Sequence, residues 1–189
     1  SDGNWGNDTA AVAWYNRGLG QSKLGQFSGA IASFNRVLEI NPQNSLALVG
    51  NCQALSNLNR FCEAISACDA AIKTNNNWGD TTPAIAWYNK GLAQKKNGQL
   101  EAAIASFDQA VAMNPKDADI WLEHGRTLAA INKPEQAAIS YEFAVKLSPN
   151  YALALASQSA SFNKLAKFKE AQTAAEQALQ GDNRWGDAN

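Results

Sequence analysis

The chain has 189 residues, 46% of them hydrophobic, and its formal net charge at pH 7 is −1. A chain so close to neutral lacks the basic face that nucleic-acid phosphates require, so we expect no nucleic-acid partner. It contains no apolar run of roughly 18 residues, so no segment is predicted to insert into a membrane. The hydrophobic content is sufficient for a packed core, and its large share of alanine suits closely packed helices.

The first predicted elements are two helices joined by a short turn. Residues 1–8 are polar, and Thr9 is a candidate N-cap for a helix over Ala11–Leu24. A Gly-Gln pair then interrupts the pattern, and apolar residues recur at helical spacing over Phe27–Ile40. Pro42 ends this second helix, because proline cannot continue a helix and disfavours helical backbone in the residue before it.

The same pair of helices recurs along the chain. The segment Val12–Gln43 reappears in closely similar form as Ala84–Lys116, with a Trp-Tyr pair, a Gly-containing turn, an Ala-rich run and an Asn-Pro stop. Such internal repetition indicates an array of repeated units, and we expect one array over residues 1–189. Joins that contain Trp-Gly lie at 1–10, 75–83 and 181–189.

The Trp-Gly pairs at Trp5, Trp78 and Trp185 repeat one feature, and the sequence stops where a further unit would begin. We therefore expect the chain to be a fragment of a longer protein. Each Trp is expected to pack a lengthened loop onto helix ends, with partner binding by an exposed loop as the alternative. No signal-peptide pattern is found at the start, which favours the cytoplasm without fixing the compartment.

Three cysteines, Cys52, Cys62 and Cys68, lie in one short region. An odd number does not indicate a disulfide framework. The chain has one histidine, His124, and no C-x-x-C pair, which argues against a zinc site. We therefore expect the cysteines to be small apolar side chains in or near the core, and we expect no metal and no other cofactor.

The repeated pattern resembles the tetratricopeptide repeat, a helix-turn-helix unit of about 34 residues. In that family, small residues at repeat positions 8 and 20 let two helices approach, and aromatic residues at positions 4 and 24 fill the surrounding space. The resemblance covers residues 11–180 and implies an all-α, right-handed superhelical solenoid of five helix-turn-helix repeats, with units at 11–44, 45–78, 84–117, 118–151 and 152–185. The sequence is similar to bacterial members of the family. The third unit carries the pattern best, with Trp87, Gly91, Gly98, Leu100, Ala103, Phe107, Ala110 and Pro115.

No enzyme motif is found: the chain has no G-x-S-x-G, no Walker loop and no H-E-x-x-H. His124 occupies repeat position 7, which is polar in every unit, so we expect a solvated or interface histidine. Asp117 and Asp119 flank a helix start, where capping and the helix dipole explain them better than metal binding does. We therefore expect no enzymatic activity.

The resemblance implies a groove lined by the first helix of each unit, since stacked helix pairs present a long concave surface. An asparagine amide both donates and accepts, so Asn16 and Asn89 are expected to hold an extended segment of a protein or peptide partner. The alternative is that the side chains of these residues make hydrogen bonds and contacts only with neighbouring helices. The predicted groove residues are Tyr15, Asn16, Leu19, Val49, Gln53, Tyr88, Asn89, Leu92, Leu122, Glu123 and Arg126, with Lys23, Lys95, Lys96 and Lys164 further along the same helices.

The expected function is that of a protein-interaction scaffold or adaptor without catalysis. The basic clamp with which some family members hold a terminal carboxylate is absent, because no frame of the repeats supplies its positive charges. The alternatives are a regulatory or targeting region of a larger enzyme, and self-association through exposed repeat ends. The usual leucine at position 7 is replaced by polar residues, which indicates either a slightly rotated first helix or a more apolar groove.

Overall fold

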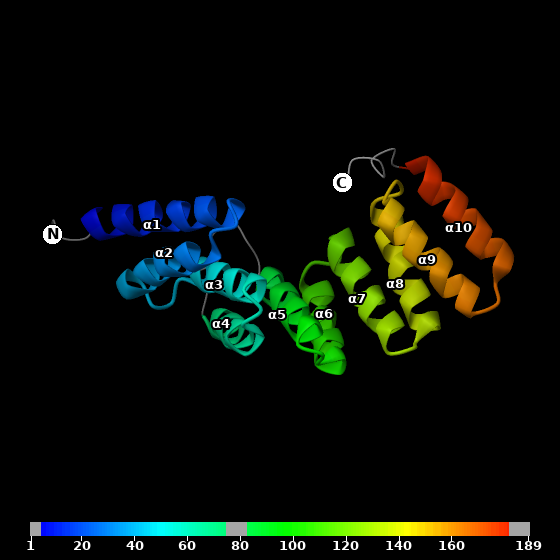
Figure 1. Ribbon diagram of the computed structural model, residues 1–189, viewed down its shortest axis with the longest axis horizontal. Helices are drawn as coiled ribbons and strands as arrows, with labels where there is room; N and C mark the ends of the chain where they lie inside the picture. Colours follow the sequence, from blue (N-terminus) through cyan, green and yellow to red (C-terminus); the bar gives the residue numbers. More distant parts are fainter. Residues whose placement is uncertain (1–4, 75–82, 182–189) are drawn as a thin grey trace. The chain divides into compact units, whose positions relative to one another are not determined.

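A computed structural model describes the backbone of residues 5–74 and 83–181, and the side chains of residues 9–74 and 83–180. The described residues form helices and turns, with no strand among them, so the expected all-α class is confirmed. Consecutive helices form antiparallel pairs such as α1–α2 and α7–α8 (Figure 1). The helices are α1 (Trp5–Lys23), α2 (Phe27–Ile40), α3 (Ser45–Asn57), α4 (Phe61–Lys73), α5 (Ala84–Lys96), α6 (Leu100–Met113), α7 (Ala118–Ala130), α8 (Pro134–Leu147), α9 (Ala152–Lys164) and α10 (Phe168–Gly181).

The later predicted units begin where the structure begins a helix. The helices α3, α5, α7 and α9 start at the first residues of the units 45–78, 84–117, 118–151 and 152–185. The turn between the two helices of each unit has a left-handed residue at the same place, repeat position 15. These residues are Gly25, Asn59, Gly98, Asn132 and Ala166, with φ between 57° and 78°.

The start of the chain differs from the prediction. The helix α1 begins at Trp5, so Thr9 lies inside it and does not cap it, and the first Trp-Gly pair is helical backbone. Trp78, Trp185 and the expected cap Thr82 lie outside the described residues. Capping is found elsewhere: Asp117 accepts hydrogen bonds from the backbone N–H groups of the next helix start, as expected.

The chain divides into two compact units, residues 1–99 (unit 1) and 100–189 (unit 2). In unit 1 the hairpins α1–α2 and α3–α4 stack, and α5 packs against α4 and α3. In unit 2 the helix α6 packs against α7, followed by the hairpins α7–α8 and α9–α10. The boundary falls inside the predicted repeat 84–117, so one continuous array stays a prediction.

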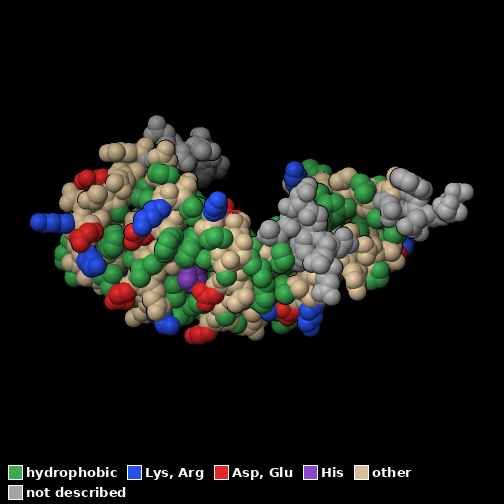
Figure 2. Space-filling model, turned by 180° about the vertical axis from the view of Figure 1, so that it is seen from behind, with side chains coloured by type: hydrophobic (Ala, Val, Ile, Leu, Met, Phe, Trp, Pro, Cys, Tyr) green, Lys and Arg blue, Asp and Glu red, His purple; other side chains and the backbone are tan. Residues whose placement is uncertain are grey.

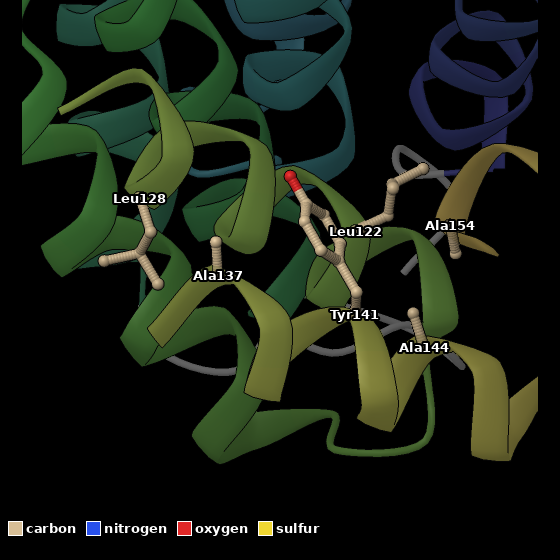
Figure 3. Close-up of a cluster of buried hydrophobic side chains, with 6 residues drawn as sticks. All are labelled: Leu122, Leu128, Ala137, Tyr141, Ala144 and Ala154. Atoms are coloured by element: carbon tan, nitrogen blue, oxygen red, sulfur yellow. The ribbon is translucent and has the colours of Figure 1, made fainter. Parts of the chain in front are cut away.

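Small residues allow the closest helix contacts in both units. A Cβ atom built at Gly18 would lie 2.6 Å from the ring of the fully buried Phe34, and one built at Gly50 would lie 2.6 Å from the same ring. In unit 2 a Cβ atom at Gly125 would lie 2.6 Å from the ring of Tyr141. Figure 3 shows Tyr141 in the middle of its cluster, beside Leu122, Ala137 and Ala144. Helices therefore cross closely at repeat position 8 in both units.

The structure places Cys52 and Cys68 in the core, as expected, but it corrects the expectation that they form no disulfide. Cys52 and Cys68 form a disulfide, with an S–S distance of 2.08 Å and a Cα–Cα distance of 5.4 Å, while Cys62 is free and exposed. The two bonded cysteines occupy positions 8 and 24, where unit 2 has Gly125 and Tyr141. The disulfide thus replaces the contact between glycine and aromatic ring that joins the two helices elsewhere. Disulfides persist mainly in oxidising compartments, which weighs against the cytoplasmic expectation.

The polar residues at position 7 have a structural explanation. Three of them reach position 25 of the preceding repeat, on the second helix of that repeat. The pairs are Asn51 Nδ2 to Asn35 Oδ1 at 2.7 Å, Lys90 Nζ to Asp69 Oδ1 at 2.6 Å, and His124 Nε2 to Asp108 Oδ1 at 3.2 Å. These contacts between repeats take the place of the leucine that the family usually has.

Candidate functional site

The first helices of unit 1 line an open pocket of about 470 Å³. It takes residues from α1, α3 and α5, together with Phe27 at the start of α2. Five of the predicted groove residues meet around it: Leu19, Gln53, Tyr88, Asn89 and Leu92. The other lining residues are Ser22, Lys23, Phe27, Ala54, Ser56, Asn57 and Lys96.

The lining residues form rows across the three helices. Repeat position 9 supplies Leu19, Gln53 and Leu92, and one turn later position 13 supplies Lys23, Asn57 and Lys96. Residues four apart lie on one face of a helix, so both rows face the pocket. The helical period alone could have found Asn57, because it follows Gln53 by one turn.

Asn89 has a different role from the one expected. It is 6% exposed, and its side-chain Nδ2 donates a 2.8 Å hydrogen bond to the carbonyl oxygen of Ile85 in its own helix. That donor is therefore engaged within α5. Asn57 Nδ2 likewise donates a 3.0 Å hydrogen bond to the carbonyl oxygen of Gln53, but Asn57 is exposed. The amide of Gln53, which is also exposed along the pocket, is therefore the better placed to contact a peptide backbone.

Two predicted groove residues are buried, which corrects their assignment. Val49 is 4% exposed and Leu122 is 2% exposed, and both belong to core clusters. Each sits at position 5 and shares its cluster with the alanine at position 3 of the next repeat, Ala86 or Ala154. Position 5 therefore packs repeats together in these two places, because the next first helix covers it.

Tyr15 and Asn16 lie on α1 outside the lining of the pocket. The Tyr15 ring packs against Phe34, with ring centroids 5.8 Å apart, and burial raises the pKa of its hydroxyl. Asn16 is exposed. The structure therefore does not bring these two residues together with the five that share the pocket.

The remaining predicted residues lie in unit 2. Arg126 lines a smaller pocket of about 230 Å³, together with Tyr141, Ser157 and Lys164. Its guanidinium contacts the carboxylate of Glu123 at 2.9 Å. Burial raises the pKa of Tyr141 to about 12, so its phenol is neutral at physiological pH.

Unit 2 also contains an Asp-His-Ser sequence of contacts. His124 Nε2 lies 3.2 Å from Asp108 Oδ1, and its Nδ1 lies 3.0 Å from Ser140 Oγ. A nucleophilic serine needs room for a substrate beside its hydroxyl. Ser140 is 2% exposed and lines neither described pocket, and its hydroxyl also lies within donating distance of the Gln136 carbonyl oxygen. The arrangement therefore joins α6, α7 and α8 and is an interface contact for His124.

The described residues contain no cluster of three or more potential metal ligands among His, Cys, Asp and Glu. In the same part of the chain, none of the helices combines the length and apolar character that crossing a membrane requires. Figure 2 shows charged side chains of both signs scattered over one face, with apolar side chains between them. The pocket of unit 1 is thus the best-defined candidate site.

Comparisons with known proteins agree with this architecture. Models of the tetratricopeptide repeat match residues 11–44 and 88–152, which together make up about half of the chain. The Protein STIP1 homolog of Dictyostelium discoideum is 27% identical over 99 residues, a match that spans 52% of this chain but only 18% of that relative. The present chain therefore corresponds to less than a fifth of that relative's length.

Solved structures share the fold. The crystal structure of MamA has a TM-score of 0.77 at 24% identity and covers 90% of this chain and 96% of its own. YrrB, described as a TPR protein with an unusual peptide-binding site, has a TM-score of 0.71 at 17% identity and covers 93% of this chain and 88% of its own. The repeated helix pairs, the small residues at their crossings and these matches show that the chain belongs to the tetratricopeptide repeat family.

Proposed function

We propose that this chain is a protein-interaction scaffold in which the pocket of unit 1 binds an extended peptide segment of a partner protein. The observation that carries the proposal is the meeting of Leu19, Gln53, Tyr88 and Leu92 from three separate helices around one open pocket. At about 470 Å³, the pocket lies within the roughly 300–1,000 Å³ that is usual for binding sites.

The chemistry of the lining suits a peptide. The side chains of Leu19, Leu92 and Tyr88 offer apolar surface for a partner side chain. Between them, the exposed amide of Gln53 can donate and accept, as the N–H and C=O groups of an extended backbone require, and the Asn57 side-chain oxygen adds an acceptor. The family match supports an interaction role, and the peptide-binding site named for YrrB is consistent with it.

The test is peptide selection on the full chain, followed by affinity measurements for the selected sequences. The variant Gln53→Ala with Tyr88→Ala removes an amide and a ring from the pocket, and we expect binding to weaken by at least about tenfold. Asn16→Ala is the matched control, because Asn16 is exposed on the same unit but does not line the pocket. Equal affinities for both variants and the parent would refute the site.

Self-association is a second candidate, favoured by one observation. The helix α10 exposes two large apolar side chains, Phe168 at 66% and Leu179 at 74%. Exposed apolar surface of this kind marks association sites when it is contiguous. Sedimentation velocity over a range of concentrations tests it: Phe168→Ser with Leu179→Ser should abolish any dimer, and a parent chain that stays monomeric would exclude it.

A further inference from the structure

The charged side chains that line the pocket of unit 1 are positive. Among the described residues that line it, Lys23 and Lys96 are the only charged ones, and both are exposed. They occupy the same repeat position, in the last turns of α1 and α5. A cation at a helix C-terminus is favoured by the helix dipole, but that interaction leaves its ammonium group solvated and able to bind an anion.

No described carboxylate of unit 1 pairs with these lysines. The acidic side chains described in this unit each pair with another cation, at 2.6 Å in every case: Glu39 with Arg36, Glu63 with Arg60, and Asp69 with Lys90. Within the residues that the structure describes, the pocket therefore presents positive charge that no carboxylate of unit 1 balances. A partner that brings carboxylates would be complementary to it.

The two lysines flank the middle of the pocket. The helix α3 contacts both α1 and α5, so Lys23 and Lys96 come from the helices on its two sides. Packed helix axes lie about 8–10 Å apart, which puts α1 and α5 roughly 16–20 Å from each other. An extended chain rises about 3.3 Å per residue, so about five residues span that distance.

Building on the peptide-binding function above, we propose that this pocket selects an internal, extended segment with an apolar side chain between two acidic side chains. The apolar side chain contacts Leu19 and Leu92, and the backbone meets the amides of α3. The carboxylates pair with Lys23 and Lys96. The carboxylates come from side chains, because one terminal carboxylate would engage only one of two lysines on opposite sides of α3.

The test uses the full chain and labelled peptides of about ten residues, a length that exceeds the expected span. Their ends are acetylated and amidated, so side chains supply the only charges. Three peptides share a central leucine and differ at the residues two positions before and two positions after it, which are Glu, Gln or Lys, so that the varied pair spans five residues. At low salt we expect the Glu peptide to bind about tenfold tighter than the Gln peptide, and added salt to reduce that ratio.

Charge reversal locates the effect. Lys23→Glu with Lys96→Glu should abolish the preference for Glu and favour the Lys peptide. The single variants Lys96→Glu and Lys73→Glu form a matched pair, since Lys73 is an exposed lysine in the last turn of α4 that does not line the pocket. We expect the preference to fall in Lys96→Glu and to persist in Lys73→Glu.

Three outcomes would overturn the proposal while leaving peptide binding in place. The Glu and Gln peptides could bind the parent equally, or Lys73→Glu could reduce the preference as much as Lys96→Glu, which would indicate net charge alone. A peptide with a free terminal carboxylate and no acidic side chain could also bind as tightly as the Glu peptide. Failure of all peptides, whatever their charge, would instead refute the proposed function itself.

Discussion

At the scale of single residues, two glycines of α1 have different surroundings. Gly18 lies against the Phe34 ring, where a Cβ atom would come within 2.6 Å, whereas a Cβ atom at Gly20 would meet no atom within 4 Å. The first glycine is required by packing. The second only weakens the helix, since glycine costs roughly 1 kcal/mol relative to alanine in a helix interior.

We therefore predict opposite effects for the same substitution two residues apart. Gly18→Ala should destabilise the protein by about 1–3 kcal/mol through overpacking against a fully buried ring. Gly20→Ala should stabilise it by up to about 1 kcal/mol. Denaturant unfolding of both variants measures the two free energies. Loss of stability in both would show that Gly20 has a packing role that the structure does not reveal.

The left-handed residue at position 15 gives a second prediction. Ala166 has a φ of 57°, a backbone conformation that costs an L-residue with a Cβ atom about 1–2 kcal/mol. Ala166→Gly should therefore raise the free energy of unfolding by up to about 1 kcal/mol. Asn132→Gly at the equivalent turn is the control and should change it less, because asparagine tolerates this conformation. An unchanged melting temperature for Ala166→Gly would argue against the turn geometry.

At the scale of helices, the disulfide replaces one of the crossings. Cys52 and Cys68 are 16 positions apart and join α3 to α4. Closing a loop of this length contributes about 3 kcal/mol in the chain-entropy account. Cys52→Ala with Cys68→Ala should lower unfolding stability by that order under oxidising conditions and should remove its sensitivity to reducing agent. Cys62→Ala should do neither, because Cys62 is free.

The contact of His124 with α6 and α8 makes unit 2 sensitive to pH. Burial lowers the pKa of His124 below its usual value of 6.5, and the nearby Asp108 carboxylate opposes this only in part. The unfolded chain then binds a proton more readily than the folded one, so stability is lost as the pH falls through about 6.5 toward the folded-state pKa. His124→Gln should flatten that dependence below about pH 6.5 in thermal melts. An unchanged slope would show that other groups titrate there.

At the scale of the whole molecule, stability is built from neighbour contacts, since helix pairs in repeat proteins touch mainly the pairs beside them. A local defect should therefore stay local. Gly18→Ala should reduce hydrogen-exchange protection in α1, α2 and α3, where the Phe34 contacts lie. Amides of α9 and α10 in unit 2 should keep theirs. Uniform loss of protection over the whole chain would indicate all-or-none unfolding.

Much of the fold could be predicted from the sequence. The spacing of small, aromatic, Gly and Pro residues that resembles the tetratricopeptide repeat places the helix starts at Ser45, Ala84, Ala118 and Ala152, where the structure begins them. These signals act over a few residues, so they can be read locally. The start of α1 is an exception: the polar stretch before Thr9 resembles a loop, but the structure continues the helix to Trp5.

What the sequence determined by itself is the repeated helix pair and its turns, because both depend on residues close in the chain. Only the tertiary structure decided that Val49 and Leu122 are buried and that Cys52 bonds Cys68. It also decided that Asn51, Lys90 and His124, at position 7, pair with the preceding repeat. These features depend on how one repeat stacks on the next. The covered faces and paired side chains follow from that stacking, which no single repeat contains.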